Sequence, residues 1–329
     1  AHSNSQPPVD SSNFYGLRAR DYEDTTTDVS TVQVDHSFND RFTLRNTSRY
    51  GRNVRDSVIT APRFAAVNTS TAINRQLQSR DMTDTIVANN TNTMGRLASG
   101  SLLHAISAGI ELSREASENF ARVGPAAPQA DLFNPNASDP YPGPIVRSGA
   151  RTKGVATSAA AYVFDTVNLT PQVELTGGLR WERFDVDYES VAVGGVTTPF
   201  ERTDEMVSWR GAAVFKPMPN ASVFAGVSTS FNPSAEGLAL TAATVTLGPE
   251  KTRNFEVGGK WDLMQNRVSL SASLFRTEKT NARTPGVNPG DPPTVLAGEQ
   301  QVSGAELGIS GRVTDKWLVI GGYAFMKST

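Results

Sequence analysis

VSLSASLFRTEKTNAR, residues 268–283, opens with a strict alternation of apolar and polar side chains. The even positions from Val268 to Leu274 are apolar, and the odd positions between them are serines. A period of two predicts a β-strand with one apolar face and one polar face. In a soluble protein the apolar face covers a core, whereas in an outer-membrane barrel it faces lipid and the serines face a wet lumen.

Short runs of the same kind recur along the chain, and about twelve strands are predicted. They form hairpin pairs, listed here by residue number: 31–38 with 41–50, 83–94 with 101–114, 152–167 with 172–188, 204–216 with 220–231, 252–263 with 267–280, and 299–313 with 316–327. Connections within pairs are short, such as Asn39-Asp40. Those between pairs are long: 51–82, 115–151, 189–203, 232–251 and 281–298. This alternation is typical of outer-membrane barrels, whereas soluble sandwiches usually mix loop lengths at both ends.

Aromatic residues and composition favour the membrane alternative. Aromatic side chains gather beside the short turns, as an interfacial girdle would: Phe38, Phe42, Phe215, Trp261 and Trp317. The hydrophobic fraction is 38% and the mean hydropathy is −0.33, values that suit a barrel with a polar lumen better than a packed globular core. No run of about 18 apolar residues predicts a transmembrane helix. The alternative is that these aromatics close the end of a soluble core.

Several functional classes find little support. The chain has no cysteine, which excludes disulfides and thiolate metal sites. Three histidines lie far apart without metal-ligand spacing, and no glycine-rich phosphate loop occurs. The net charge of −2 is interspersed, so no nucleic-acid partner is expected. We therefore predict that the protein is not an enzyme and carries neither a metal nor a cofactor of its own.

Two longer stretches carry a family resemblance. KPMPNASVFAGVSTSFNPS (216–234) and LGPEKTRNFEVGGKWDLMQNRVSLSASLFRTEKTNART (247–284) resemble the barrel motifs of TonB-dependent siderophore receptors. The resemblance implies an all-β fold, a transmembrane antiparallel β-barrel seen in part, with about 12 of roughly 22 strands. It implies that residues 1–329 form the central portion of the barrel domain, with the plug domain and the last strands outside this chain.

By the same resemblance, the expected function is energy-coupled uptake of a ferric siderophore, of catecholate type, across the bacterial outer membrane. The expected partners are the siderophore as transported ligand, the inner-membrane protein TonB acting through the plug, and outer-membrane lipid and lipopolysaccharide around a monomer. A receptor of this fold for cobalamin, haem or a sugar remains open. So do a passive porin or adhesin, and a soluble all-β binding protein.

Candidate ligand contacts follow from the chemistry of ferric siderophores, which are anionic, bulky and partly aromatic. Arginine and aromatic side chains suit such ligands. On the long connections we predict Arg63, Phe64, Phe120, Phe133, Tyr141 and Arg147, and at lumen-facing strand positions Arg45, Arg49, Arg180 and Arg210. The alternative for each single residue is an ordinary solvated charge or loop side chain.

Overall fold

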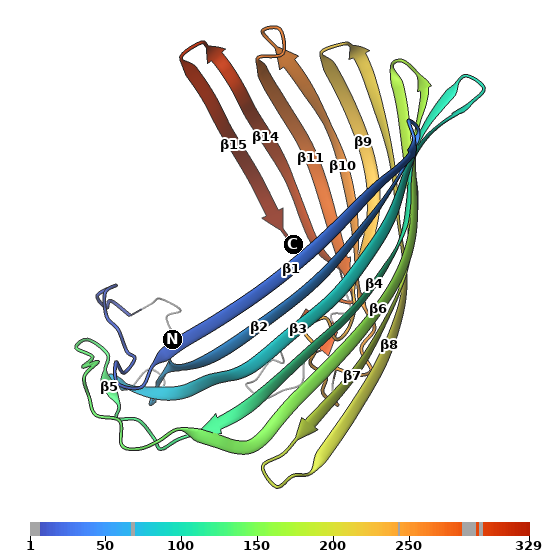
Figure 1. The fold of residues 1–329 in the computed structure, drawn as a ribbon. Coiled ribbons are helices and arrows are strands. Elements are labelled where there is room, and N and C mark those ends of the chain that lie inside the picture. The colour runs from blue at the N-terminus through green and yellow to red at the C-terminus, as the bar shows by residue number, and fades with distance from the viewer. Residues whose placement is uncertain (1–6, 67–69, 243, 285–293, 296–298) are drawn as a thin grey trace.

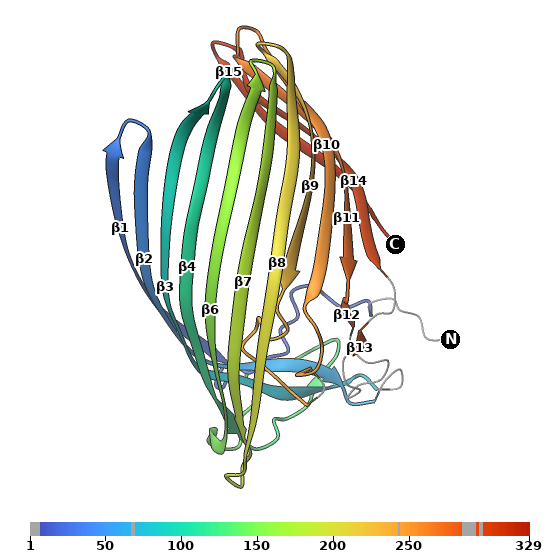
Figure 2. The same cartoon turned by 90° about the vertical axis from the view of Figure 1, so that its right-hand side faces the viewer.

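The computed structural model describes residues 7–66, 70–242, 244–284, 294–295 and 299–329. One antiparallel sheet dominates it, a curved open wall in which successive strands lie side by side (Figures 1 and 2). The strands are β1 (Tyr22–Asn39), β2 (Phe42–Phe64), β3 (Ala72–Ser99), β4 (Leu102–Val123), β5 (Ala130–Asp131), β6 (Val146–Thr170), β7 (Val173–Val191), β8 (Thr197–Met218), β9 (Ala221–Asn232), β10 (Glu250–Leu263), β11 (Val268–Thr280), β12 (Arg283–Thr284), β13 (Thr294–Val295), β14 (Gln300–Thr314) and β15 (Trp317–Ser328).

The sheet runs in sequence order from β1 to β15 through twelve strands, with β5 added beside β3 and the small β12–β13 pair separate. Within the described residues β1 pairs only with β2, and β15 only with β14, so the sheet is not closed. The twelve predicted strands and their hairpin pairing are confirmed. No helix in the described part of the chain is long and apolar enough to cross a membrane.

The strand register gives most of the sheet two faces of different chemistry. Val223, Gly259, Ala272, Leu307 and Tyr323 form one row of paired residues from β9 to β15. The rows on this face expose large apolar side chains, so we call it the apolar face. The alternate residues, including Ser271 and Ser273 of β11, lie on the polar face. The alternation predicted for 268–274 therefore extends through most of the wall. The last strand, β15, departs from it, because Leu318 and Ile320 are exposed apolar residues at its polar-face positions.

Several strands are longer than the apolar alternation predicts. β2 continues to Phe64 and β3 begins at Ala72, so most of the expected connection 51–82 is strand. Likewise β7 and β8 approach each other through residues 192–196, which shortens the expected connection 189–203. The placement of Arg63, Phe64, Phe120 and Arg147 on loops is therefore wrong, because they lie in strands. Part of the expected connection 281–298 lies outside the described residues.

The short turns still alternate with longer connections. Residues 40–41, 100–101, 171–172, 219–220, 264–267 and 315–316 join hairpins at one end of the wall, which we call the short-turn side. Residues 124–145 and 233–249 are the longest fully or largely described connections at the other end, the long-loop side. Buried apolar clusters occur only with these connections among the described residues. The wall itself has no conventional core, as expected for a sheet with solvent or lipid on each face.

Candidate ligand-binding surfaces

Four of the predicted arginines share the polar face. Arg45 lies in one paired row with Asn92, Gly109, Tyr162 and Arg180, a row that crosses from β2 to β7. Arg49 lies on the same face of β2, and Arg210 is two residues from Ser208, which pairs with Arg180. The lumen-facing placement predicted for Arg45, Arg49, Arg180 and Arg210 is consistent with this register, since all four occupy one face.

The partners of these arginines differ. Arg45 forms an ion pair with Asp35, with Nε 2.6 Å from Oδ1. Arg180 lies between two carboxylates, 2.5 Å from Glu111 and 3.0 Å from Glu182. Arg49 donates to the Thr31 hydroxyl at 3.3 Å. Among the described residues no carboxylate pairs with Arg49, so its charge is the more available one for an anionic ligand.

A hollow of about 530 Å³ lies on the polar face between Arg49 and Arg180. Glu111, Glu115 and Glu182 contribute carboxylates to its lining, together with hydroxyl and amide groups such as Ser113, Ser158 and Asn90. The hollow is thus charged in both senses and rich in hydrogen-bonding groups. Ala88, Leu112 and Phe184 also line it, so the hollow combines hydrogen-bonding groups with apolar contact surface.

Arg210 is supported differently, by an aromatic ring instead of a carboxylate. Its guanidinium lies 4.2 Å from the centroid of the Phe164 ring. That ring lies against Gly178, where an added Cβ would come within 1.8 Å of Phe164 Cδ1. The absence of a side chain at Gly178 therefore lets Phe164 cover the backbone and present its face to Arg210.

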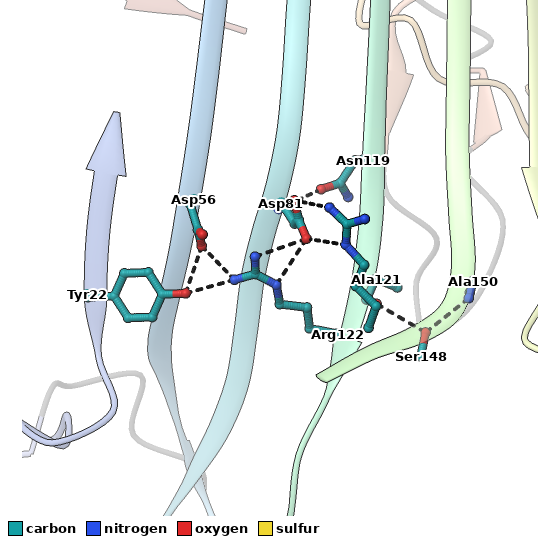
Figure 3. A network of polar contacts seen from close by, with 9 residues as sticks. Tyr22, Asp56, Asp81, Asn119, Ala121, Arg122, Ser148 and Ala150 are labelled. Atoms are coloured by element: carbon teal, nitrogen blue, oxygen red, sulfur yellow. Dashed lines mark hydrogen bonds and ion pairs between the residues drawn. The ribbon is translucent and has the colours of Figure 1, made fainter. Parts of the chain in front are cut away.

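A second polar group lies on the long-loop side and joins five strands (Figure 3). Arg122 of β4 reaches Asp81 of β3 at 3.0 Å and Asp56 of β2 at 2.6 Å, and donates to the Tyr22 hydroxyl of β1 at 2.9 Å. Arg147 of β6 binds the same Asp81 through Nε at 2.7 Å and through a second nitrogen at 3.0 Å. We call these five residues the clasp.

The clasp lies on the continuation of the apolar face. Asp56 and Asp81 are paired directly and share the parity of Leu44 and Val87 in their strands. They lie beyond the roughly 9–11 residues that a tilted strand uses to cross a bilayer, counted from the short turns. Charged residues are therefore acceptable at this level, although the same face is apolar closer to the short-turn side.

The hydrogen bonds and charges within the clasp shift the pKa values of its acidic groups. The hydrogen bond from Arg147, with a further one from Arg122, holds the pKa of Asp81 below its usual value. The Arg122 hydrogen bond likewise lowers the pKa of Asp56, and the carboxylate of Asp56 raises the pKa of the Tyr22 hydroxyl. The lowered pKa values favour ionised Asp56 and Asp81, and the raised pKa favours a neutral Tyr22 hydroxyl, so the carboxylates can pair with both arginines at neutral pH.

Of the predicted residues, Arg147 belongs to the clasp, and Phe120 and Tyr141 lie beside it. Arg147 stacks over the Phe120 ring at 3.9 Å, and Tyr141 lines the adjoining hollow of about 590 Å³. Phe133, Arg63 and Phe64 are exposed elsewhere on the long-loop side. The structure therefore does not assemble the ten residues into one site. It forms a polar-face group of four and a clasp group of three, on opposite faces of the sheet.

Sequence reasoning missed the anchors that hold the long-loop side together. Arg75 is fully buried and binds Asp139 at 2.8 Å as well as the backbone carbonyls of Tyr15, Pro128 and Asn136. Arg20 is equally buried, pairs with Asp21 and donates to Thr60. The contacts of Arg75 join residues at least 53 positions apart in the chain, so no local sequence pattern predicts them.

No group of three or more histidine, aspartate or glutamate side chains that could hold a metal ion occurs among the described residues. His104 Nδ1 lies 2.7 Å from Asp165 Oδ2, near the short-turn side on the apolar face. The chemistry that the described surfaces offer is hydrogen bonding, ion pairing and stacking.

Comparisons with known proteins agree with this architecture. The sequence profile of the family described as TonB dependent receptor-like, beta-barrel matches residues 2–329. The catecholate siderophore receptor Fiu of Escherichia coli K12 is 30% identical over 357 aligned residues, covering 98% of this chain and 46% of Fiu. The probable siderophore receptor PiuA of Acinetobacter baumannii is 28% identical, covering 96% of this chain and 46% of PiuA.

Solved structures show the same fold. The closed form of the ferric-catecholate import receptor Fiu superposes with a TM-score of 0.88 at 30% identity, covering 99% of this chain and 50% of that one. PiuA superposes with a TM-score of 0.88 at 24% identity, covering 98% and 49%.

This chain spans about half the length of the curated relatives it matches, and those relatives are transport receptors. The alternation of its strands, the two chemically distinct faces and the family match lead to one conclusion. The chain belongs to the TonB-dependent receptor family of the bacterial outer membrane and forms part of its β-barrel.

Proposed function

We propose that the full protein takes up a ferric siderophore of catecholate type across the outer membrane. The observation that carries this proposal is the polar face, where four arginines share one side of a wall whose other side is apolar. The similarity to Fiu, whose name states a catecholate ligand, supports the ligand class. Uptake of this kind makes and breaks no bond in the siderophore, so the protein is not an enzyme and needs no resident cofactor.

In this proposal the long-loop side captures the ligand and the polar face lines its path inward. Arg147 has a half-exposed guanidinium, and Arg63, Tyr141 and Phe133 lie on the same side. Arg49 and Arg210 then offer charge along the wall. TonB would supply energy through a plug that lies outside residues 1–329, and the receptor would act as a monomer.

Membrane lipid is the remaining proposed partner. On the apolar face near the long-loop side, Lys251 lies 5.8 Å from the centroid of Phe231, and Arg253 lies two residues along the same strand. Cations beside aromatic rings suit the phosphates of lipopolysaccharide in the outer leaflet. The same face between the two interfaces would contact acyl chains.

The binding test uses the full-length receptor in detergent. Ferric catecholate, ferric hydroxamate and cobalamin are titrated while intrinsic tryptophan and tyrosine fluorescence is followed. We expect submicromolar quenching by ferric catecholate alone. Quenching by cobalamin alone would identify another nutrient, and a full-length receptor that responds to none of the three would contradict siderophore capture.

Charge reversal then tests the capture residues. Arg63→Glu and Arg147→Glu together should weaken ferric catecholate binding at least tenfold, because charge-assisted hydrogen bonds contribute about 1.5–3 kcal/mol each. The matched control is Arg41→Glu in the exposed turn between β1 and β2, at the opposite end of the wall. Unchanged affinity in the double variant would count against capture at this side.

A further inference from the structure

A large hollow lies on the apolar face, close to the short-turn side. It has a volume of about 770 Å³ and spans β8 to β15. The side chains that point into it are outward-facing and apolar, among them Val223, Trp261, Leu307 and Tyr323. Ser271 and Lys260 also line the hollow, although they occupy polar-face positions of their strands.

The shape of the hollow follows from side-chain size along two neighbouring rows. In the row Val223–Gly259–Ala272–Leu307–Tyr323 the middle positions are small and the flanking ones large. In the next row toward the turns, Ala221 and Gly321 are the small end positions, and the larger Trp261, Leu270 and Ile309 lie between them. Leu307 and Tyr323 are 57% and 65% exposed, so they stand above the small Gly259 and Ala272 of the neighbouring strands. An apolar groove with an uneven floor results.

The end of the groove toward the short turns has a different chemistry. Trp317, 70% exposed, shares the outward parity of Gly321 and lies directly beside the turn 315–316. Lys316 occupies that turn, and Arg267 lies across from it, 2.7 Å from Asp315. Tryptophan and lysine at the end of an apolar surface are the arrangement that membrane interfaces favour. Asp315 offsets the charge of Arg267, so Lys316 leaves this end of the groove with a net positive charge where headgroups would lie.

We propose that this groove is a site for one phospholipid of the inner leaflet of the outer membrane. One acyl chain lies in the hollow that Gly259, Ala272 and Gly321 help to line, and the phosphate approaches Lys316 beside Trp317. Two observations select this occupant over a protein partner: the lining is mostly apolar in a wall that stands in lipid, and the end toward the short turns carries Lys316 and Arg267 at headgroup level. The proposal is independent of which ligand the receptor imports.

The test fills the groove in the full-length receptor. Gly321→Leu is suitable because a Cβ there would meet only Ile309 Cγ2 at 3.4 Å, an ordinary contact. The matched control is Gly211→Leu on β8, which has the same outward parity and nothing within 4 Å of an added Cβ. Both receptors are purified in mild detergent with phosphatidylglycerol and phosphatidylethanolamine, and bound lipid is measured by native mass spectrometry.

We expect a one-lipid adduct on the wild type and on Gly211→Leu, and at least a fivefold smaller adduct on Gly321→Leu. Lys316→Gln should keep the adduct but lose a preference for phosphatidylglycerol over phosphatidylethanolamine. Equal adducts on all receptors would show non-specific lipid contact, and no adduct on any would show that the groove retains no lipid; either result overturns the proposal. Unchanged thermal unfolding of Gly321→Leu confirms that the variant is folded.

Discussion

At the residue scale, the molecule depends on arginines that bridge distant segments. Arg122 of β4 binds residues of three other strands in the clasp, and Arg75 joins β3 to the segment before β1 and to the connection 124–145. Each guanidinium offers several donors in a fixed plane, which suits such bridging better than lysine. The sequence predicted that arginines would matter on this side. It did not predict their partners, because those contacts join residues far apart in the chain.

Acid should weaken the clasp. The pKa of Asp81 lies below its unfolded value near 4, so its pairing with Arg147 and Arg122 stabilises the fold above that pH. The contribution disappears as pH falls through the folded-state pKa. We expect the thermal midpoint of the full-length receptor to drop as pH falls below about 4.

The comparison is with Asp81→Asn, whose amide cannot lose a charge. Its thermal midpoint should be lower than that of the wild type at pH 7, and the gap should narrow as the wild-type carboxylate becomes protonated. If the two proteins keep a constant difference from pH 7 to pH 2.5, the Asp81 charge does not stabilise the folded state.

At the element scale, the pairing of the strands and the face on which each side chain lies were predictable wherever one face meets lipid. The strand 268–274 alternates because lipid selects apolar residues on one side only. Above the membrane both faces are hydrated, and the alternation fades. AINRQLQSRDM, at the start of β3, is largely polar yet continues the sheet. The sequence therefore predicted strands that are too short on the long-loop side.

Alternation in β11 can be measured directly, since this chain has no cysteine. Nitroxide labels are attached to single cysteines at Leu270 and Ala272 or at Ser271 and Ser273, in a full-length receptor without other cysteines. We expect labels at the first two positions to be relaxed mainly by oxygen, which partitions into lipid. Labels at the serine positions should respond less to oxygen. The same oxygen response at all four positions would contradict the two-faced wall.

The connection 233–249 folds against the polar face, where Ala235 and Leu240 pack on Ala156 and Val186. Gly154 makes this close approach possible, because an added Cβ would lie 2.5 Å from the Leu238 carbonyl oxygen. Leu238 itself has a φ of 50°, so its backbone has little freedom to yield. Gly154→Ala should therefore displace the connection.

The displacement is read as faster amide hydrogen exchange at Leu238, Thr244 and Leu247, which donate local backbone hydrogen bonds. Gly177→Ala is the control, since nothing lies within 4 Å of an added Cβ there. Exchange that stays slow in Gly154→Ala would mean that the connection is held by other contacts, such as the hydrogen bond from Ser234 to Asp204.

At the scale of the whole molecule, the described strands form an open wall with lipid chemistry outside and a charged polar surface inside. Composition and loop asymmetry predicted this architecture, and the family motifs predicted its relatives. The candidate site was less predictable. Parity placed Arg45, Arg49, Arg180 and Arg210 on one face, but it could not show that Phe120 and Arg147 lie on the other, since they were assigned to loops without parity.

Energised uptake is the central claim, and transport into cells tests it most directly. Iron-starved cells that lack their other catecholate receptors are supplied with radiolabelled ferric catecholate, with and without the full-length receptor. We predict accumulation only when the receptor is present and the inner membrane is energised, and none of ferric hydroxamate. Accumulation that persists after the inner-membrane potential is collapsed would instead indicate a passive pore and contradict the account.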